Sequence, residues 1–378
     1  MIKAGILGGG QLGRMLLQEA INFPVETFVL ENDAQCPAAH LCHHFIKGDI
    51  RDYDTVLAFG ALVDVITIEI ESVNTDALEL LEKQGKTVIP SPRILKLIKN
   101  KIRQKQFYKE MEIPSPVFEV TASLGDLQQH RSFLPAVHKI AEGGYDGRGV
   151  QVMESEIDFG KGFNHPAVLE KKVNIAKEIA IIVAADAKGK LAIYPPVEMI
   201  VDPYLNLLDY QLSPAHIEEK IKWKAEAIAI KLVKAFESPG VFAIEMLIDR
   251  NNEVWVNETA PRVHNSGHHT IEAHFSSQYN MLWRIMLGYP LGNTGAIMPS
   301  ALINLVGEKE HTGEAYYEGL ETVLQMEEAY VHVYGKSETK PGRKMGHVTV
   351  LGKDRLDLVH KAKLVKEKMK VVTKKAIF

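Results

Sequence analysis

The middle of the chain carries the loop Glu142-Gly143-Gly144-Tyr145-Asp146-Gly147-Arg148-Gly149, which separates two predicted strands instead of preceding a helix. A hairpin turn alone would explain the glycines, but it would not explain why Asp146 and Arg148 alternate with them. We therefore interpret the loop as a flexible cover over a polyphosphate. Lys139 lies in the upstream strand 135–140, where its ammonium group would reach the same phosphates as a point charge.

Further along the chain, two glutamates lie on neighbouring predicted strands. Glu245 belongs to the strand 241–248 and Glu258 follows the strand 254–257, with a turn at 249–252 between them. Facing side chains on paired strands lie close enough to share a cation, and adjacent carboxylates repel each other unless a proton or a metal neutralises them. Hard oxygen ligands of this kind suit Mg²⁺. The alternative is two separately solvated glutamates, but their apolar strand neighbours favour a buried metal site.

The first hundred residues alternate short apolar runs with helical patterns, which is typical of a parallel sheet that binds ligands at the carboxyl ends of its strands. Gly8-Gly9-Gly10-Gln11-Leu12-Gly13 connects the strand 3–7 to a helix and matches the G-x-G-x-x-G pattern. Its amides would bind a phosphate of a substrate or of a dinucleotide, with Glu31 in the position of a ribose-binding acid. The alternative is a glycine turn needed only for tight packing, and the motif by itself is a weak signal.

Apolar spacing predicts the remaining elements. The expected helices lie at residues 94–111, 225–236 and 359–369, and the expected strands at 25–30, 63–68, 168–170, 178–184, 330–334 and 347–351. The organisation changes after residue 305. The pattern as a whole indicates a multidomain α/β protein, with α+β parts.

The composition excludes several classes of protein. The 378 residues fit two or three domains, and 44 Lys plus Arg against 48 Asp plus Glu give a net charge of −4, too small to suggest a nucleic-acid binder or a membrane-surface protein. No apolar run approaches the roughly 18 residues of a membrane span. Cys36 and Cys42 cannot form a disulfide scaffold, and Met1-Ile2-Lys3 leads into a strand without room for a signal peptide. We expect a cytoplasmic protein.

Two histidine-bearing segments have the composition of a metal site but not its geometry. His264 and His268 have the i, i+4 spacing of a zinc pair, but Ser266 and Gly267 argue against a regular helix there. In the segment 36–44, adjacent Cys and His side chains point apart in any regular backbone. We therefore interpret neither segment as a zinc site.

A basic loop surrounds Pro341-Gly342. Its members are Lys336, Lys340, Arg343 and Lys344. A solvated turn is the usual explanation for such a run, whereas a phosphate clamp is the functional one, because Arg binds phosphate with two hydrogen bonds. The composition leaves both explanations open.

These motifs, in this order, resemble the ATP-grasp superfamily and, within it, the 5-(carboxyamino)imidazole ribonucleotide synthase family of purine biosynthesis. The resemblance covers essentially the whole chain. It rests on residues 5–15, on Gly143–Gly149, on Asn257-Glu258 with Pro261-Arg262 and His264-Asn265-Ser266-Gly267-His268, and on Pro341-Gly342-Arg343-Lys344-Met345-Gly346-His347. The last two segments are specific to the family.

The resemblance implies three domains: a Rossmann-like domain at 1–98, a two-lobed ATP-grasp domain at 99–305 with a flexible lobe at about 135–200, and a small β-rich domain at 306–378. Mg²⁺ would be held by Glu245 and Glu258. ATP would lie between the lobes on Lys101, Lys139, Gly144, Tyr145, Asp146, Gly147, Arg148, Gly149, Val150, Glu170, Lys171, Lys172, Val173, Glu178, Asn257 and Glu258. Lys101 stands where related sequences more often carry Arg.

The implied reaction is that of an ATP-dependent carbon–nitrogen ligase: ATP, bicarbonate and 5-aminoimidazole ribonucleotide give the carbamate, ADP and phosphate through carboxyphosphate. The resemblance also implies a homodimer. The ribonucleotide would bind to Gly10, Gln11, Leu12, Glu71, Arg262, Lys336 and Arg343, with Asp146, Arg148, Arg262 and His268 in catalytic positions.

Three other functions remain open on the sequence. Another ATP-grasp ligase or a formate-dependent transformylase would share the metal and ATP sites but not the acceptor. A nicotinamide-dependent oxidoreductase would use the first glycine motif, but it leaves the second glycine loop and both glutamates unexplained. A nucleotide-binding sensor would bind ATP and Mg²⁺ without turnover.

Overall fold

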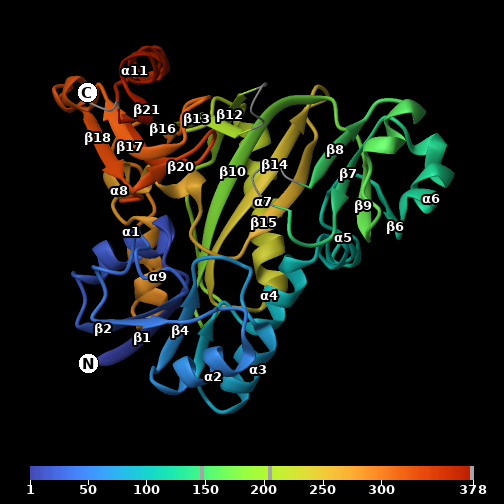
Figure 1. Cartoon of the computed structure of the whole chain (residues 1–378). Coiled ribbons are helices and arrows are strands. Elements are labelled where there is room, and N and C mark those ends of the chain that lie inside the picture. Colours follow the sequence, from blue (N-terminus) through green and yellow to red (C-terminus); the bar gives the residue numbers. More distant parts are fainter. Residues whose placement is uncertain (145–148, 203–206, 375–378) are drawn as a thin grey trace.

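The chain is organised around three sheets and a smaller fourth one, shown in Figure 1. The computed structural model describes residues 1–144, 149–202 and 207–374; of residues 201, 202 and 207–209 it describes only the backbone. The N-terminal sheet is parallel, with the order β3-β2-β1-β4-β5. Its elements are β1 (Ile2–Leu7), α1 (Gln11–Ala20), β2 (Val25–Glu31), β3 (His44–Lys47), α2 (Tyr53–Ala61), β4 (Val65–Ile68), α3 (Thr75–Lys83) and β5 (Thr87–Ile89). The predicted parallel sheet is confirmed.

The helical stretch expected at 94–111 is two helices, α4 (Pro92–Lys99) and α5 (Lys101–Glu110). Asn100 separates them, because its backbone is extended and its side chain accepts a hydrogen bond from the amide of Arg103 at 3.1 Å. Asparagine is a preferred N-cap for this reason. The break places Lys101 at the first position of α5.

A four-stranded sheet with the order β6-β9-β7-β8 forms a separate lobe, at the right of Figure 1. It comprises β6 (Phe118–Thr121), α6 (Leu124–Leu127), η1 (Gln128–Phe133), β7 (Ala136–Ile140), β8 (Val150–Met153), η2 (Glu156–Lys161) and β9 (Ala167–Lys171). Because β7 and β8 pair antiparallel, the second glycine loop does connect a hairpin, as predicted. Of the lobe expected at 135–200, the part beyond Lys171 lies instead in the larger sheet.

The larger sheet has nine strands in the order β15-β14-β10-β12-β13-β16-β20-β18, with β11 beside β10. Its strands are β10 (Ile175–Ala185), β11 (Leu191–Ile193), β12 (Val197–Asp202), β13 (Leu207–Ser213), β14 (Gly240–Asp249), β15 (Val254–Ala260), β16 (Ser300–Val306), β18 (Ala329–Val333) and β20 (Lys344–Leu351). The sheet therefore runs without interruption across the domain boundary expected at residue 305. A three-stranded sheet consists of β17 (Gly313–Glu318), β19 (Glu338–Thr339) and β21 (Lys370–Thr373).

Two hydrophobic cores cover the two faces of the larger sheet. Alternate residues of β10 and β14 pack on α7 (Glu219–Phe236) on one face, and the intervening residues pack on α9 (Gln278–Met286) and α1 on the other. Trp283 of α9 is fully buried and donates its indole N–H to the carbonyl of Leu16 in α1 at 2.7 Å. This contact fixes the N-terminal sheet against the site-bearing strands.

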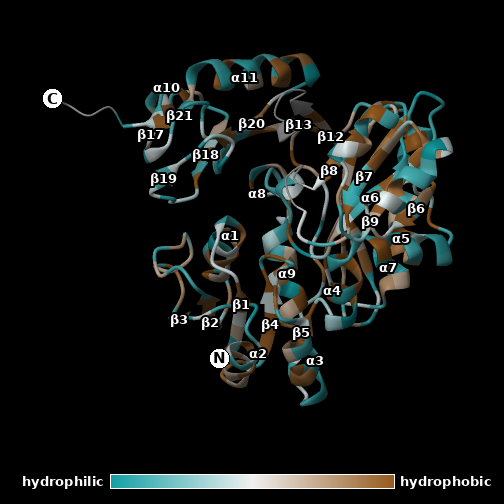
Figure 2. Cartoon of the chain, turned by 45° about the vertical axis from the view of Figure 1, so that its right-hand side comes forward, coloured by the Kyte–Doolittle hydropathy of each residue, from teal (hydrophilic) through white to brown (hydrophobic). Residues whose placement is uncertain are grey.

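The remaining helices are η3 (Asn265–Gly267), α8 (Thr270–Ala273), α10 (Leu320–Leu324) and α11 (Arg355–Lys368). Helices such as α3 and α11 carry both hydrophilic and hydrophobic segments in Figure 2, as expected of helices with one buried and one solvent-facing side. In the described part of the chain, no helix is both long and apolar enough to cross a membrane.

Candidate active site

Glu245 of β14 and Glu258 of β15 are direct cross-strand partners, as the sequence predicted. A register shift follows at Glu245/Met246, so the pair lies where the two strands diverge from a regular ladder. Their side chains are 24% and 43% exposed, which leaves both carboxylates open to a ligand. Burial and the neighbouring charge of Glu258 raise the pKa of Glu245. The charge of Lys101 lowers the pKa of Glu258.

The pair fits the donor chemistry of magnesium. Both groups are carboxylates, and the burial and mutual repulsion that raise the pKa of Glu245 are effects that a bound cation would oppose. Among the described residues, no three His, Cys, Asp or Glu side chains cluster as a metal site. Mg²⁺ commonly binds through one or two carboxylates and completes its coordination with phosphate oxygens and water. The two glutamates are therefore sufficient only together with a phosphate ligand.

Lysines from α5 and β7 converge on these strands. Lys101 Nζ lies 3.0 Å from Glu258 Oε2. Lys139 of β7 donates to Asn257 Oδ1 at 2.7 Å and lies 3.1 Å from Glu170 Oε2. The structure thus brings together five of the predicted ATP-binding residues, and it connects the small lobe to the larger sheet through the ammonium group of Lys139.

Lys105 belongs to the same cluster and was not predicted. It is 2% exposed, and its Nζ lies 3.3 Å from Glu170 Oε2 and 3.5 Å from the carbonyl oxygen of Val256. Burial lowers the pKa of Lys105 to about 8. The charges of Lys139 and Lys105 outweigh the effect of burial and lower the pKa of Glu170. The only feature of the sequence that points to Lys105 is its position one turn after Lys101. That spacing does not predict burial, because lysines at such spacing are usually solvated.

The segment 170–173, predicted to bind ATP, lies where β9 ends and the chain leaves the four-stranded lobe. Glu170 is 3% exposed and its Oε1 has no hydrogen-bond partner among the described residues. The amides of Lys171 and Lys172 donate to the carbonyls of Val117 and Pro135 at 2.8 and 3.1 Å. The segment 170–172 therefore offers a ligand the buried acceptor oxygen of Glu170, whereas the amides of Lys171 and Lys172 already donate to backbone carbonyls.

Glycine is required where the second glycine loop returns to β8. Gly149 has a φ of +81°, and a Cβ there would lie 2.5 Å from Cγ2 of Ile140. Its carbonyl accepts from the amide of Ile140 at 2.9 Å and so closes the hairpin before Val150. Four of the predicted ATP-binding or catalytic residues lie outside the described residues: Tyr145, Asp146, Gly147 and Arg148.

Two residues predicted for the ribonucleotide are paired with each other. Arg262 Nε lies 2.9 Å from Glu71 Oε1, and Nη2 donates to Oε2 of the same carboxylate at 3.1 Å. His264, two residues on, directs Nε2 toward Glu245 Oε1 at 3.7 Å. The segment that follows β15 thus connects the N-terminal domain to the paired carboxylates.

One residue of the basic loop, Lys344, acts on the paired carboxylates, whereas Lys336 and Arg343 donate to backbone carbonyls. Lys336 donates to the carbonyl of Lys344 at 2.7 Å, and Arg343 donates to that of Glu338 at 2.7 Å. The positive charge of Lys344 lowers the pKa of Glu245, although burial and Glu258 outweigh it. Lys344 therefore lies near enough to Glu245 to contribute to the charge of the site, a role that the sequence did not single out.

The amides of the first glycine loop are hydrogen-bonded within the protein, so binding a phosphate there, as predicted, would require these bonds to be exchanged. Glu69, at the end of β4, accepts hydrogen bonds from the amides of Gly10 and Leu12, and Glu31 accepts from Gly9 at 3.1 Å. Two carboxylates therefore hold three of the amides that the phosphate interpretation requires. Burial raises the pKa of Glu69. A contact of Gly10, Gln11 and Leu12 with the ribonucleotide stays a prediction, and its use of the two amides that Glu69 holds would require the same exchange.

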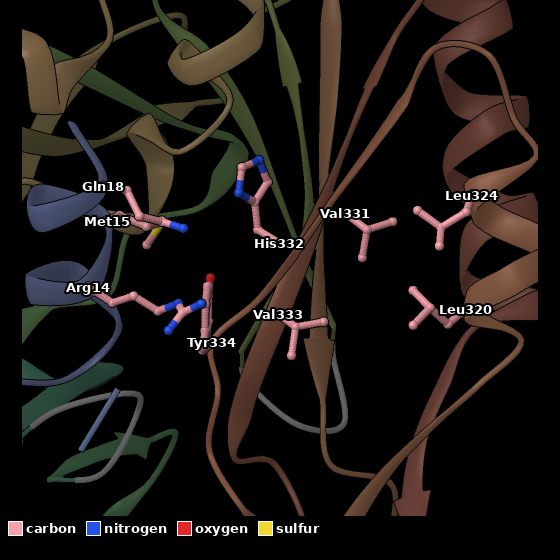
Figure 3. A pocket seen from close by; sticks show the side chains of 9 residues that line it. All are labelled: Arg14, Met15, Gln18, Leu320, Leu324, Val331, His332, Val333 and Tyr334. Atoms are coloured by element: carbon pink, nitrogen blue, oxygen red, sulfur yellow. The ribbon is translucent and has the colours of Figure 1, made fainter. Parts of the chain in front are cut away.

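A separate cavity of about 360 Å³ lies between the N-terminal and C-terminal regions (Figure 3). Arg14 extends from α1 toward Tyr334, and His332 lies between them and the apolar side chains of β18 and α10. The lining consists of Arg14, Met15, Gln18, Leu320, Leu324, Val331, His332, Val333 and Tyr334. It contains none of the predicted site residues, so we assign it no part in the chemistry.

Three family models match successive parts of the chain. The ribonucleotide synthetase preATP-grasp domain matches residues 1–99, the ATP-grasp domain residues 106–279, and the phosphoribosylaminoimidazole carboxylase C-terminal domain residues 300–361. Together they cover the same succession of domains that the sequence predicted.

Curated relatives match along nearly the whole chain. The chloroplastic phosphoribosylaminoimidazole carboxylase of Vigna aconitifolia is 35% identical over 93% of this chain, and the chain spans 64% of the length of that protein. The N5-carboxyaminoimidazole ribonucleotide synthase of Bacillus subtilis is 31% identical over 92% of this chain and 90% of the relative.

Solved structures of proteins with nearly the same name as the Bacillus relative are similar to this chain over almost its whole length. N5-carboxyaminoimidazole ribonucleotide synthetase from Thermotoga maritima superposes with a TM-score of 0.92 at 37% identity, over 99% of this chain and 100% of its own. The Aspergillus clavatus synthase, in complex with ADP and 5-aminoimidazole ribonucleotide, gives 0.87 at 29% identity, over 97% and 98%. The chain therefore belongs to the N5-carboxyaminoimidazole ribonucleotide synthase family, whose members are ATP-grasp ligases of purine biosynthesis.

Proposed function

We propose that the chain carboxylates 5-aminoimidazole ribonucleotide with bicarbonate and ATP, giving N5-carboxyaminoimidazole ribonucleotide, ADP and phosphate. One observation carries the proposal: Lys101, predicted to bind ATP, pairs with Glu258, and His264, two residues after the Arg262 that pairs with Glu71, approaches Glu245. A phosphoryl donor and a nitrogen acceptor would therefore meet at the metal-binding pair. The Aspergillus structure, which holds ADP and the ribonucleotide together, supports this arrangement.

ATP would bind between the small lobe and the larger sheet. The N6 amino group of adenine would donate to the buried, unpartnered Oε1 of Glu170, and adenine would accept from the amide of Val173, since those of Lys171 and Lys172 are used elsewhere. Glu178 of β10 would take the ribose hydroxyls. Lys101 and Lys139 would then turn from Glu258 and Glu170 toward the phosphates as point charges.

The charge that develops on the phosphates is met by fixed groups of the chain. Glu245 and Glu258 would hold Mg²⁺, which when bound supplies positive charge against the oxygens of the phosphates. Bicarbonate attacks the γ-phosphorus in line, the bond to ADP breaks, and carboxyphosphate forms. The lysines and Arg148 of the glycine loop would stabilise the negative charge that spreads over the transferring group.

The ribonucleotide would bind on the C-terminal side of the same site. Its 5′-phosphate would replace the loop carbonyls that Lys336 and Arg343 now hold. Arg262 and Glu71 would orient the aminoimidazole next to carboxyphosphate, which breaks down to CO₂ and phosphate beside the amine. Holding the two reactants together is the main contribution at this step. Asp146 and the released phosphate are the two candidate acceptors for the proton of the amine.

A coupled ADP-release assay tests the proposal. We expect ADP and phosphate to be released only when ATP, Mg²⁺, bicarbonate and 5-aminoimidazole ribonucleotide are all present, with the carbamate detected by trapping. Turnover with formate in place of bicarbonate would identify a transformylase, and binding of ATP without turnover would identify a sensor. Oxidation of a reduced nicotinamide cofactor would contradict the proposal altogether.

We also propose that the chain acts as a homodimer, as the family resemblance suggests. We propose the cytoplasm as its compartment, because both cysteines are unpaired, as in a reducing environment. Sedimentation of the purified chain at micromolar concentration would test the dimer. A mass of 84 kDa, twice the 42.2 kDa of the chain, is expected, and a stable monomer that turns over at the full rate would refute it.

A further inference from the structure

The side chain of Gln278, at the first position of α9, is fully buried and holds the backbone of His264 at two points. Its Oε1 accepts from the amide of His264, and its Nε2 donates to the carbonyl of the same residue, both at 2.8 Å. A backbone amide can only donate and a backbone carbonyl can only accept. These two bonds therefore fix which end of the Gln278 side chain is the oxygen and which is the nitrogen.

The second proton of that nitrogen points to an imidazole. Gln278 Nε2 lies 3.3 Å from His268 Nδ1, and the hydroxyl of Tyr279 lies 2.8 Å from the same nitrogen. Because an amide nitrogen cannot accept, the contact with Gln278 favours Nδ1 of His268 as an acceptor, and the Tyr279 hydroxyl, which also lies 3.4 Å from Sδ of Met15, can act as a second donor to it. Burial lowers the pKa of His268 well below 6.5, which favours the neutral ring, and with Nδ1 as the acceptor the one proton of that ring lies on Nε2. That Nε2 is buried and has no hydrogen-bond partner among the described residues.

The chain is built closely around this amide. A Cβ on Gly267 would lie 2.4 Å from Gln278 Oε1 and 2.3 Å from Cδ1 of Ile182, so only glycine allows the approach. The amide of Gln278 itself donates to Oγ1 of Thr270 at 2.9 Å. The loop 264–270 therefore packs around the side chain of Gln278, which belongs to α9.

We propose that Gln278 is a positioning residue for the acceptor reaction, holding His264 beside Glu245 and keeping the proton of His268 on Nε2. The proposal deepens the proposed function and rests on it, since His264 approaches Glu245 and His268 is one of the residues predicted to be catalytic. A buried N–H without an acceptor is unfavourable, so this donor requires an acceptor that the described protein atoms do not provide. A substrate oxygen, or a water that the substrate orders, is of the required chemistry.

The tautomer can be measured directly in the unmodified protein. In a ¹⁵N-histidine-labelled sample, the long-range ¹H–¹⁵N spectrum distinguishes a protonated from an unprotonated ring nitrogen, and the His268 signals are assigned by their loss in His268→Gln. We expect an unprotonated Nδ1 and a protonated Nε2. A protonated Nδ1 would overturn the proposal. Because this measurement needs no turnover, it remains decisive even if the proposed reaction fails.

The isosteric change Gln278→Glu replaces the donor with an acceptor. We expect the His268 proton to move to Nδ1 and kcat to fall about 10- to 100-fold, as when other orienting partners are removed, while the Kd for ADP stays within about twofold. Gln128→Glu, the same change at an exposed position, should leave both unchanged. If Gln278→Glu fails to fold, Gln278→Met replaces it in the test. Met keeps the length of the side chain without a hydrogen-bonding amide, and we expect the same loss of kcat.

The alternative is that Gln278 only stabilises the fold. In that case kcat and ADP affinity would fall together with the thermal midpoint, and the tautomer would not change in Gln278→Glu. A kcat within twofold of the unmodified protein, in an enzyme that does turn over the ribonucleotide, would refute the positioning role and leave the proposed function intact.

Discussion

Lys101 and Glu258 form an ion pair with Nζ 3.0 Å from Oε2, although 157 positions separate them in the sequence. The pair joins the start of α5 to the end of β15. It holds the pKa of Glu258 low, so this carboxylate is ionised at neutral pH, whereas burial and the charge of Glu258 raise the pKa of its partner Glu245. The site thus contains one ionised carboxylate that is paired with a lysine and a second that gains most from a divalent cation.

Replacing Lys101 should weaken nucleotide binding more than the chemical step. In Lys101→Met the phosphates lose one charge-assisted contact of about 1.5–3 kcal/mol, so we expect a 10- to 100-fold higher Kd for ADP. Lys101→Arg keeps the charge and should stay within about fivefold of the unmodified protein. Isothermal titration with ADP and Mg²⁺ measures both variants. An unchanged Kd in Lys101→Met would show that the lysine serves only Glu258.

Glu258→Gln should abolish phosphoryl transfer while the fold stays intact. The amide keeps the shape of the side chain but cannot replace the charge that holds Mg²⁺, so we expect kcat to fall at least about 100-fold. Higher Mg²⁺ should restore part of it. Glu253→Gln, an exposed position on the same hairpin, is the matched control and should be silent. The assay is ADP release against Mg²⁺ concentration, and a normal rate in Glu258→Gln would remove the proposed metal role.

Gly267→Ala should destabilise the protein and inactivate it. The new methyl group would overlap Cδ1 of Ile182 and Oε1 of Gln278, which corresponds to overpacking of about 1–3 kcal/mol. Gly160→Ala is the control, because a Cβ there meets no atom within 4 Å. Urea unfolding compares the two midpoints. Equal midpoints would mean that the loop 264–270 adapts to the methyl group.

Lys105 should make the stability depend on pH above neutrality. Its pKa is lowered from 10.5 to about 8 in the folded protein, so between these values the unfolded chain binds one proton more than the folded one. The free energy of unfolding therefore gains from this group as the pH rises from 8 to 10.5, by up to about 3 kcal/mol. Below pH 8 that gain is absent.

The difference between variants isolates this contribution. Urea unfolding at pH 8, 9 and 10 should show the rise in the unmodified protein and in Lys109→Met, an exposed lysine of the same helix, but not in Lys105→Met. Parallel pH profiles for all three proteins would show that Lys105 titrates normally.

Much of the site follows from patterns that act locally. The alternation of β14 and β15 and the short turn between them bring Glu245 and Glu258 together on one hairpin, as predicted, whereas the register shift at Glu245/Met246 that makes them direct partners is not visible in the sequence. The glycine loop after β7 is likewise recognisable, because antiparallel strands flank it.

Contacts between distant segments could not be predicted in this way. Glu69 occupies the amides of the first glycine loop only because β4 lies beside β1 in the sheet, a neighbour relation that the motif itself does not contain. Lys105 is buried because α5 packs against β9 and β15, and nothing in its own helix distinguishes it from a solvated lysine. Gln278 reaches His264 through a loop that folds back on itself.

Transfer of the phosphoryl group to bicarbonate is the central claim, and isotope transfer tests it most directly. With ¹⁸O-labelled bicarbonate, ATP, Mg²⁺ and 5-aminoimidazole ribonucleotide, the oxygen that attacks the γ-phosphorus stays on phosphate when carboxyphosphate breaks down. Mass spectrometry of the released phosphate should therefore find one ¹⁸O atom for each molecule of N5-carboxyaminoimidazole ribonucleotide formed. Unlabelled phosphate, released while the carbamate accumulates, would contradict the account.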